Sequence, residues 1–182
     1  WAFRADAEGL RIEAPDWHAD VRWRRIDLAR ELDSVPFADA QLVTAAALLD
    51  LVSAAWFDAL LGPVRRAGAA VLFALSVDGR IGWDPVLDED EAIHGLFAAH
   101  QRRDKGFGPS LGVDAPAWAA TRLEAAGYGV TQARSDWRIE DLPVLQAMIE
   151  GMAAAAMEQE PGAMARVLAW RAQRLALAPR SQ

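Results

Sequence analysis

The sequence of 182 residues predicts an α/β fold in which helices flank a mostly parallel sheet. Two short apolar runs, Gln41 to Leu49 and Ala69 to Val77, are typical of strands buried on both faces of such a sheet. Segments with helical periodicity and capping residues separate and follow these runs. Because strands that alternate with helices build parallel sheets, and because this length can bury a core, we expect one domain over residues 1–182.

The segments before the first apolar run give weaker signals. Residues 1–20 mix charged and apolar side chains and predict only a short strand or loop. Val21 to Leu28 alternates in polarity and then reaches Asp27, which predicts a strand that ends in an acidic turn. The residues from Arg30 to Pro36 form a connector.

The rest of the chain is dominated by helical patterns. Ser53 can cap a helix that runs to about Arg66. The acidic run that begins at Asp88 opens the next helix, and two arginines follow its end, which complements the helix dipole. Asp114 caps a third helix, which stops at Gly127.

Two further strands and two final helices complete the prediction. Asp78-Gly79 is a turn signal, so Arg80 to Trp83 can return as a hairpin arm. Gly129 to Ile139 is interpreted as a strand. The last two helices run from about Leu142 to Met157 and from Gly162 to Ala178, and together they form a carboxy-terminal pair at about residues 142–178.

Composition excludes several classes of function. The formal net charge of −7 makes the chain a poor candidate for binding nucleic acid or an anionic membrane. No apolar run approaches the roughly 20 residues that cross a bilayer. Absence of cysteine excludes disulfides and thiolate chemistry, and the three histidines lack ligand spacing, so we expect no metal site. A cytoplasmic location is the simplest interpretation.

Four segments carry a resemblance to a known family. They are Leu42 to Ser53, Leu72 to Arg80, His100 to Pro109 and Ala133 to Arg138. Together they resemble class I, Rossmann-like S-adenosylmethionine-dependent methyltransferases, and more narrowly a family of small bacterial methyltransferase-like proteins, over roughly residues 21–178. The resemblance implies a Rossmann-like sheet, S-adenosylmethionine as cofactor and a small-molecule methyl acceptor.

The chain departs from that family at both ends of the domain. It has no G-x-G-x-G loop, which would approach the methionine part of the cofactor, and Gln41 stands where the family commonly has an acid. The family's final strand is also missing. The resemblance therefore implies a partial methyltransferase domain, incomplete at its amino-terminal and carboxy-terminal ends and inactive alone. Its unpaired sheet edge would be covered by further polypeptide or by a second copy in a homodimer.

The resemblance implies five cofactor-binding residues. Asp27 would accept a hydrogen bond from the adenine amino group, and Leu28 would pack on the ring. Thr44, Leu49 and Asp50 would lie near the cofactor, because ligands bind beyond the carboxyl ends of strands in open α/β sheets. The alternatives are a turn or helix-cap aspartate at Asp27, sheet core for Thr44 and Leu49, and a helix cap at Asp50.

The loop from His100 to Pro109 is the candidate substrate clamp. Its basic residues can hold an acidic substrate, and His100 or Asp104 can accept a proton as the catalytic base. Aromatic residues can form the sides of the substrate pocket. The alternatives are a solvated helix end and structural tryptophans. The candidate substrate-binding residues are Trp56, Arg102, Arg103, Lys105, Phe107 and Trp137.

Three hypotheses for function follow. The first is methyl transfer to a small molecule, with catalysis mainly by positioning of the reactants. The second is a non-catalytic methyltransferase-like module for interaction or regulation, which the absent glycine loop favours. The third is a dinucleotide-dependent oxidoreductase, which would need a similar glycine-rich fingerprint.

Overall fold

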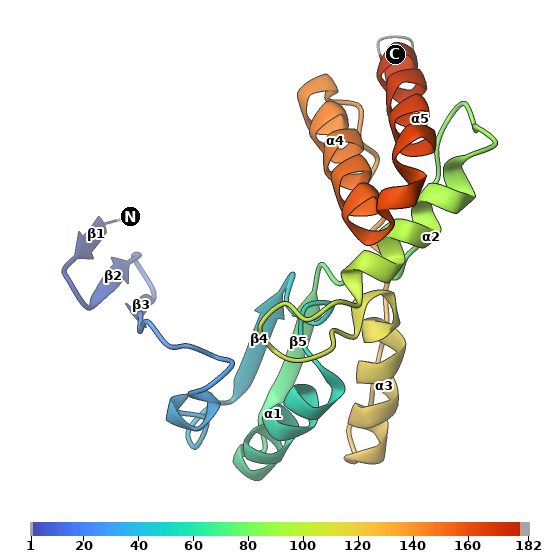
Figure 1. Ribbon diagram of the computed structural model, residues 1–182. Helices are drawn as coiled ribbons and strands as arrows, with labels where there is room; N and C mark the ends of the chain where they lie inside the picture. Colours follow the sequence, from blue (N-terminus) through green and yellow to red (C-terminus); the bar gives the residue numbers. More distant parts are fainter. Residues whose placement is uncertain (1, 179–182) are drawn as a thin grey trace. The chain divides into compact units, whose positions relative to one another are not determined.

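The computed structural model describes residues 2–178. The chain divides after Pro36 into two compact units, and each is described by itself. The described residues contain five α-helices, a three-stranded antiparallel sheet and a two-stranded parallel sheet (Figure 1). The α/β class is thus confirmed, whereas parallel pairing is limited to two strands. The prediction of one domain over residues 1–182 stays a prediction.

The first unit contains a three-stranded antiparallel meander, whereas the sequence predicted only a short strand or loop over residues 1–20. Strands β1 (Ala2–Ala5), β2 (Gly9–Glu13) and β3 (His18–Arg22) pair in that order. The turn between β1 and β2 forms around Asp6, whose Oδ1 accepts hydrogen bonds from the N–H groups of Glu8 and Gly9 at 2.8 Å. The prediction of a strand from Val21 to Leu28 is wrong, because β3 begins earlier, at His18, and ends at Arg22.

The register of this meander separates apolar from charged side chains. Phe3 pairs with Ile12 and Ile12 with Ala19, so one face carries apolar residues, while Arg11 and its charged neighbours occupy the other face. On the charged face, Arg11 Nη1 lies 3.5 Å from Asp20 Oδ1. Side chains alternate across a strand, and the apolar positions of three short strands therefore coincide. The apolar face consists of Phe3, Ala5, Leu10, Ile12, Ala19 and Val21.

The second unit contains the parallel sheet. Strands β4 (Leu42–Ala46) and β5 (Ala70–Ala74) pair in parallel, with Ala46 opposite Ala74. Helix α1 (Ala54–Ala67) connects them. Ser53 caps α1 as predicted, since its Oγ accepts a hydrogen bond from the Trp56 N–H at 3.2 Å. On the helix side of the sheet, the rings of Phe57 and Phe73 meet edge to face at 5.9 Å.

The prediction that both strands are buried on both faces is wrong. Val43 and Phe73 are half-buried on one face of the sheet, whereas Leu42 is 53% exposed and Leu72 57% exposed on the other. Both strands are also shorter than the apolar runs that predicted them. A continuous apolar run does not reveal whether a second layer exists, and α1 covers only one face.

Two predicted strands are absent from the described residues. Arg80 to Trp83 forms no hairpin arm, and Gly129 to Ile139 is not a strand. Two contacts hold the segment from Gly129 to Ile139 near the sheet. Just before it, the Tyr128 hydroxyl donates a hydrogen bond to the Ala69 carbonyl at 3.1 Å, and towards its end Asp136 forms an ion pair with Arg80 at 3.0 Å. A segment forms a strand only where a neighbouring strand supplies hydrogen bonds, and here an open cleft of about 1960 Å³ borders both β5 and this segment.

The remaining helices lie where the sequence predicted them, with differences of a few residues at their ends. Helix α3 (Ala115–Ala125) lies beside α1, while α2 (Asp90–Gln101), α4 (Leu142–Gln159) and α5 (Met164–Leu177) form a bundle with its own core (Figure 1). The last helix begins later than predicted, because a 3-10 turn at Pro161–Ala163 precedes it. Asp114 stands at the start of α3 but does not cap it through its side chain. The bundle core includes the fully buried side chains of Ile93, Ile149, Met152, Val167 and Trp170.

A buried ion pair joins two helices of this bundle. Arg174 of α5 is 2% exposed and binds Asp90 of α2, which is 6% exposed. Asp90 also accepts hydrogen bonds from the Trp170 indole at 2.8 Å and the Leu87 N–H at 2.9 Å. Burial acts to raise the pKa of Asp90, but these hydrogen bonds and the Arg174 charge together hold it below its usual value. The charges are thus buried with their partners in place.

Candidate functional site

The carboxyl ends of β4 and β5 have an unusual backbone. Ala47 and Leu75, the first residues after the two strands, have φ values of 52° and 56°. This left-handed region costs a residue other than glycine of order 1–3 kcal/mol. Since Ala46 pairs with Ala74, the two residues lie side by side, and the Ala47 N–H extends the ladder to the Ala74 carbonyl at 3.1 Å. Strained backbone conformations of this kind cluster at functional sites, so the carboxyl edge of β4 and β5 is a candidate site.

Two buried polar atoms lie just beyond this edge. Within the described residues, Asp50 Oδ1 and Ser76 Oγ are buried and have no hydrogen-bond partner. Asp50 follows β4 by four residues and Ser76 follows β5 by two. A buried polar atom without a partner costs about 1–3 kcal/mol. Native proteins tolerate few such groups, so their occurrence after neighbouring parallel strands marks this edge as the candidate binding site.

A loop from α2 to α3 is fastened over the turn that follows β4. The Leu111 N–H donates to the Val52 carbonyl at 2.8 Å, and the Gly112 N–H donates to the Asp50 carbonyl at 3.0 Å. The Ser110 hydroxyl lies 2.9 Å from the Leu51 carbonyl oxygen and 2.8 Å from that of Arg103. These contacts bring the two sequence-predicted segments, Leu49-Asp50 and the His100–Pro109 loop, together in space.

The loop also brings an aromatic pair to the site. Phe107 meets the buried Trp56 edge to face, with ring centroids 5.5 Å apart. Asp104 shapes the turn before it, since its Oδ1 accepts from the Gly106 N–H at 2.6 Å and from the Gly108 N–H at 3.0 Å. The φ of Gly108 is 84°, a conformation that favours glycine. The candidate base Asp104 is thus engaged by backbone donors of its own loop.

The cofactor-binding candidates of the second unit are only partly brought together. Leu49 is 3% exposed and lies beside the cleft, next to Asp50. Thr44 lies in the middle of β4 on the exposed face, away from the strand end. Leu49 and Asp50 are therefore the candidates of this group that lie at the carboxyl edge.

Asp27 and Leu28 belong to the first unit. The Asp27 carboxylate accepts from the Ala29 N–H at 3.0 Å and pairs with Arg30 at 2.9 Å. These are the contacts of a turn aspartate, which is the alternative interpretation from the sequence. The roles of Asp27 and Leu28 in binding adenine stay a prediction.

Most charged candidates of the loop already have acidic partners. His100 Nε2 and Arg103 Nη1 lie 3.2 and 2.6 Å from the carboxylate oxygens of Glu158 on α4. The hydrogen bond to His100, with the Arg103 charge, lowers the pKa of Glu158. Arg102 binds Asp114 at 3.0 Å, whereas Lys105 is exposed and forms no ion pair with the described residues. Lys105 is therefore the loop cation most accessible to an acidic substrate.

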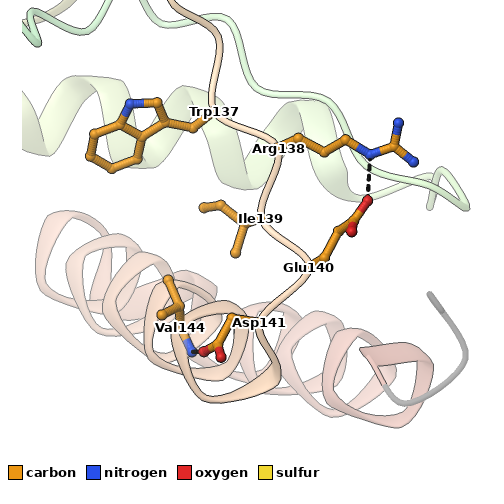
Figure 2. Close-up of a pocket in the computed structure, with 6 residues that line it drawn as sticks. All are labelled: Trp137, Arg138, Ile139, Glu140, Asp141 and Val144. Atoms are coloured by element: carbon orange, nitrogen blue, oxygen red, sulfur yellow. Dashed lines mark hydrogen bonds and ion pairs between the residues drawn. The ribbon is translucent and has the colours of Figure 1, made fainter.

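Trp137 lies outside the carboxyl edge. Its side chain is 74% exposed on the segment before α4. It lines a shallow hollow of about 340 Å³. Figure 2 shows it there together with Ile139 and Val144 and with the Arg138–Glu140 ion pair. All six residues around this hollow come from residues 137–144, so it is a local surface feature. Trp137 also borders the large cleft, which leaves its substrate-binding role a prediction.

Sequence reasoning missed two residues of the site, Ser76 and Ser110. Ser76 had a usable signal, because it is the first hydroxyl residue after the apolar run of β5. Ser110 had none, since its partners, the carbonyls of Leu51 and Arg103, are recognisable only once the loop is in place.

No group of three or more metal-binding side chains occurs among residues 2–178. Within the same range, no helix has the length and apolar character needed to span a membrane. Comparisons of the chain with protein-family models, with curated proteins and with solved structures found no match.

Proposed function

We propose that the protein transfers a methyl group from S-adenosylmethionine to a small-molecule acceptor, with its site at the carboxyl edge of β4 and β5. This chain would supply part of a Rossmann-like domain. The observation that carries the proposal is the pair of buried atoms without partners, Asp50 Oδ1 and Ser76 Oγ, after neighbouring parallel strands. The four segments that resemble class I methyltransferases include this edge and the loop fastened over it.

The donor set at this edge suits such a cofactor. S-adenosylmethionine carries a sulfonium cation, an ammonium group and ribose hydroxyls, all of which a carboxylate oxygen or a serine hydroxyl can bind. When bound, it supplies a methyl group activated by the positive sulfur. Asp50 would hold a cationic or hydroxyl-bearing part of the cofactor, and the Trp56–Phe107 pair would exclude water beside it.

The acceptor side would be formed by the loop. Lys105 is the exposed cation that can draw an acidic acceptor toward the edge. Catalysis would come chiefly from orientation of the acceptor atom against the methyl group, which can contribute several kcal/mol. A base is optional in this scheme, which agrees with the prior engagement of His100 and Asp104 in other hydrogen bonds.

Calorimetric titration of the full-length gene product with S-adenosylmethionine tests this proposal. We expect saturable binding that weakens roughly tenfold or more in Asp50→Asn, because a charge-assisted hydrogen bond contributes about 1.5–3 kcal/mol. The matched control is Asp39→Asn, an exposed aspartate before the amino end of β4 that should bind as the unmodified protein does. Absence of binding at millimolar cofactor would refute the proposal, and equal affinity in Asp50→Asn would remove Asp50 from the site.

A second function is favoured by a separate observation. Leu42 and Leu72, with neighbouring alanines and Thr44, form an exposed and mainly apolar face on the parallel sheet. Exposed apolar sheet faces commonly mark interaction surfaces. The alternative is a non-catalytic methyltransferase-like module in which this face meets the same face of a second copy.

Sedimentation velocity at micromolar concentration tests the alternative. We expect a dimer that dissociates in Leu72→Asp, because burial of a carboxylate at the apolar interface is costly. Leu168→Asp places the same charge at an exposed leucine of α5 and should leave the dimer intact. A monomer in the unmodified protein would exclude this arrangement.

A further inference from the structure

The indole of Trp83 is held between two helices of the bundle. Its Nε1–H donates to His94 Nε2 on α2 at 2.8 Å, and the planes of the two rings differ by 27°. From α5, the guanidinium carbon of Arg174 lies 4.6 Å from the centre of the Trp83 ring, and Trp170 meets the ring edge to face. The attachment of Trp83 to α2 therefore depends on a hydrogen bond to a histidine.

This hydrogen bond requires a neutral imidazole. The indole N–H is a donor only, so His94 Nε2 must accept, with the ring proton on Nδ1. A protonated imidazolium has donors at both nitrogens and cannot accept the bond. Protonation of His94 would also place a second cation beside the indole that Arg174 already contacts. The Trp83–His94 contact can thus exist in only one protonation state of the histidine.

Two charged groups among the described residues act on His94. Asp90 lies one turn earlier on α2, and Arg174 approaches from α5. Burial is the main cause that lowers the pKa of His94; Asp90 acts to raise the pKa, and Arg174 acts to lower it. The segment before α2 presents the uncharged Trp83 indole to the ring. The neutral state therefore holds at neutral pH, and protonation follows below the usual histidine value of 6.5.

The segment that carries Trp83 also borders the large cleft. Residues 81–85 line the cleft on their way from β5 to α2. At the end of this stretch, the Pro85 carbonyl accepts from Arg174 at 2.7 Å, and two residues later the Leu87 N–H donates to Asp90 at 2.9 Å. Both hydrogen bonds persist in mild acid, because their side-chain partners keep their charges. Asp90 stays ionised, since its pKa is lowered, and Arg174 stays protonated. The Trp83–His94 bond is the attachment that a proton can break.

We propose that Trp83 and His94 form a proton-operated latch on the cleft. With His94 neutral, the latch holds residues 81–84 against α2. Protonation breaks the bond and releases residues 81–84 from α2, while the contacts of Trp83 with α5 and the anchors at Pro85 and Leu87 keep the segment attached to the bundle.

The direction of the pH effect follows from the pKa of His94. Because the folded value is lowered, the stability that the latch contributes is fully present above pH 6.5 and is lost as the pH falls through the folded value. The latch is closed at neutral pH and opens in mildly acidic solution. His94 can bind a proton in the unfolded chain and in the opened latch, but not in the closed latch.

Nuclear magnetic resonance on the full chain tests the latch. The indole N–H signal of Trp83, assigned with Trp83→Phe, should titrate with a midpoint below 6.5 that coincides with that of the His94 Cε1–H signal. Amide protection factors at residues 81–84 should fall across the same midpoint. In His94→Gln, whose amide oxygen accepts the bond at every pH, the indole signal should not titrate.

His100→Gln is the matched control, because His100 also bonds a side chain but on the far end of α2. It should leave the Trp83 titration unchanged. A Trp83 signal that ignores pH, or one that still titrates in His94→Gln, would overturn the proposal. If His94→Gln does not fold, the unmodified chain decides: separate midpoints for the His94 and Trp83 signals would equally exclude the latch.

Discussion

Replacement of Asp90 by alanine is expected to lower the free energy of unfolding by about 3–5 kcal/mol, because it strands a buried cation. Arg174 is 2% exposed, and Asp90 supplies its carboxylate partner. The same substitution removes the acceptor for the Trp170 indole and the Leu87 N–H. Urea denaturation followed by circular dichroism measures the loss.

The control for this prediction is Asp88→Ala. Asp88 is exposed two residues earlier, so its replacement should change stability by no more than about 0.5 kcal/mol. Arg174→Met added to Asp90→Ala should recover part of the loss, since it removes the stranded charge. A loss below about 1 kcal/mol in Asp90→Ala would mean that the ion pair contributes little to the native state.

The same carboxylate predicts a pH dependence. The pKa of Asp90 is held below 3.8, so its contribution to stability is present above that pH and is lost as the pH falls through its folded value. Asp90→Asn should therefore unfold with a weaker dependence on acid than the unmodified chain.

Replacement of Phe57 by alanine is expected to cost about 3–5 kcal/mol, the usual range for a buried phenylalanine. Phe57 is 0% exposed on α1, and its ring meets Phe73 of β5. The substitution leaves a cavity between helix and sheet that the neighbouring backbone can close only in part. Thermal and urea unfolding curves measure the effect.

Leu42→Ala is the informative control for that experiment. Leu42 lies on the opposite face of the same sheet and is 53% exposed, so its truncation should cost below about 1 kcal/mol. A cost similar to that of Phe57→Ala would show that another surface covers this face in solution, as the homodimer alternative requires. A small loss in Phe57→Ala would contradict the packing described for α1.

The helices were predictable because their signals are local. Ser53 accepts a hydrogen bond from Trp56, three residues away, and the apolar stripe of α4 recurs within single turns. The three short strands of the first unit were not resolved by the prediction of a short strand or loop, although Leu10 and Ile12 alternate with Arg11 and Glu13. Four or five residues of alternation are too few to distinguish a strand from a loop without knowledge of the pairing.

The candidate site was predictable in part. Asp50 follows an apolar strand, a position from which the sequence alone predicts proximity to a ligand. Whether its carboxylate would find a partner could not be predicted, because that depends on the loop around Ser110, about sixty residues further on. The same limit applies to His100, whose pairing with Glu158 crosses from α2 to α4.

By itself, the sequence determined which segments form helices, to within a few residues at their ends, and which two runs become parallel strands, since capping, periodicity and apolar runs act over a few residues. The tertiary structure alone decided how these elements are covered. It buries Asp90 against Arg174, leaves one face of the β4–β5 sheet exposed, and leaves Asp50 Oδ1 and Ser76 Oγ without partners. Burial and hydrogen-bond pairing depend on residues distant in the chain, and such contacts form only when the chain has folded.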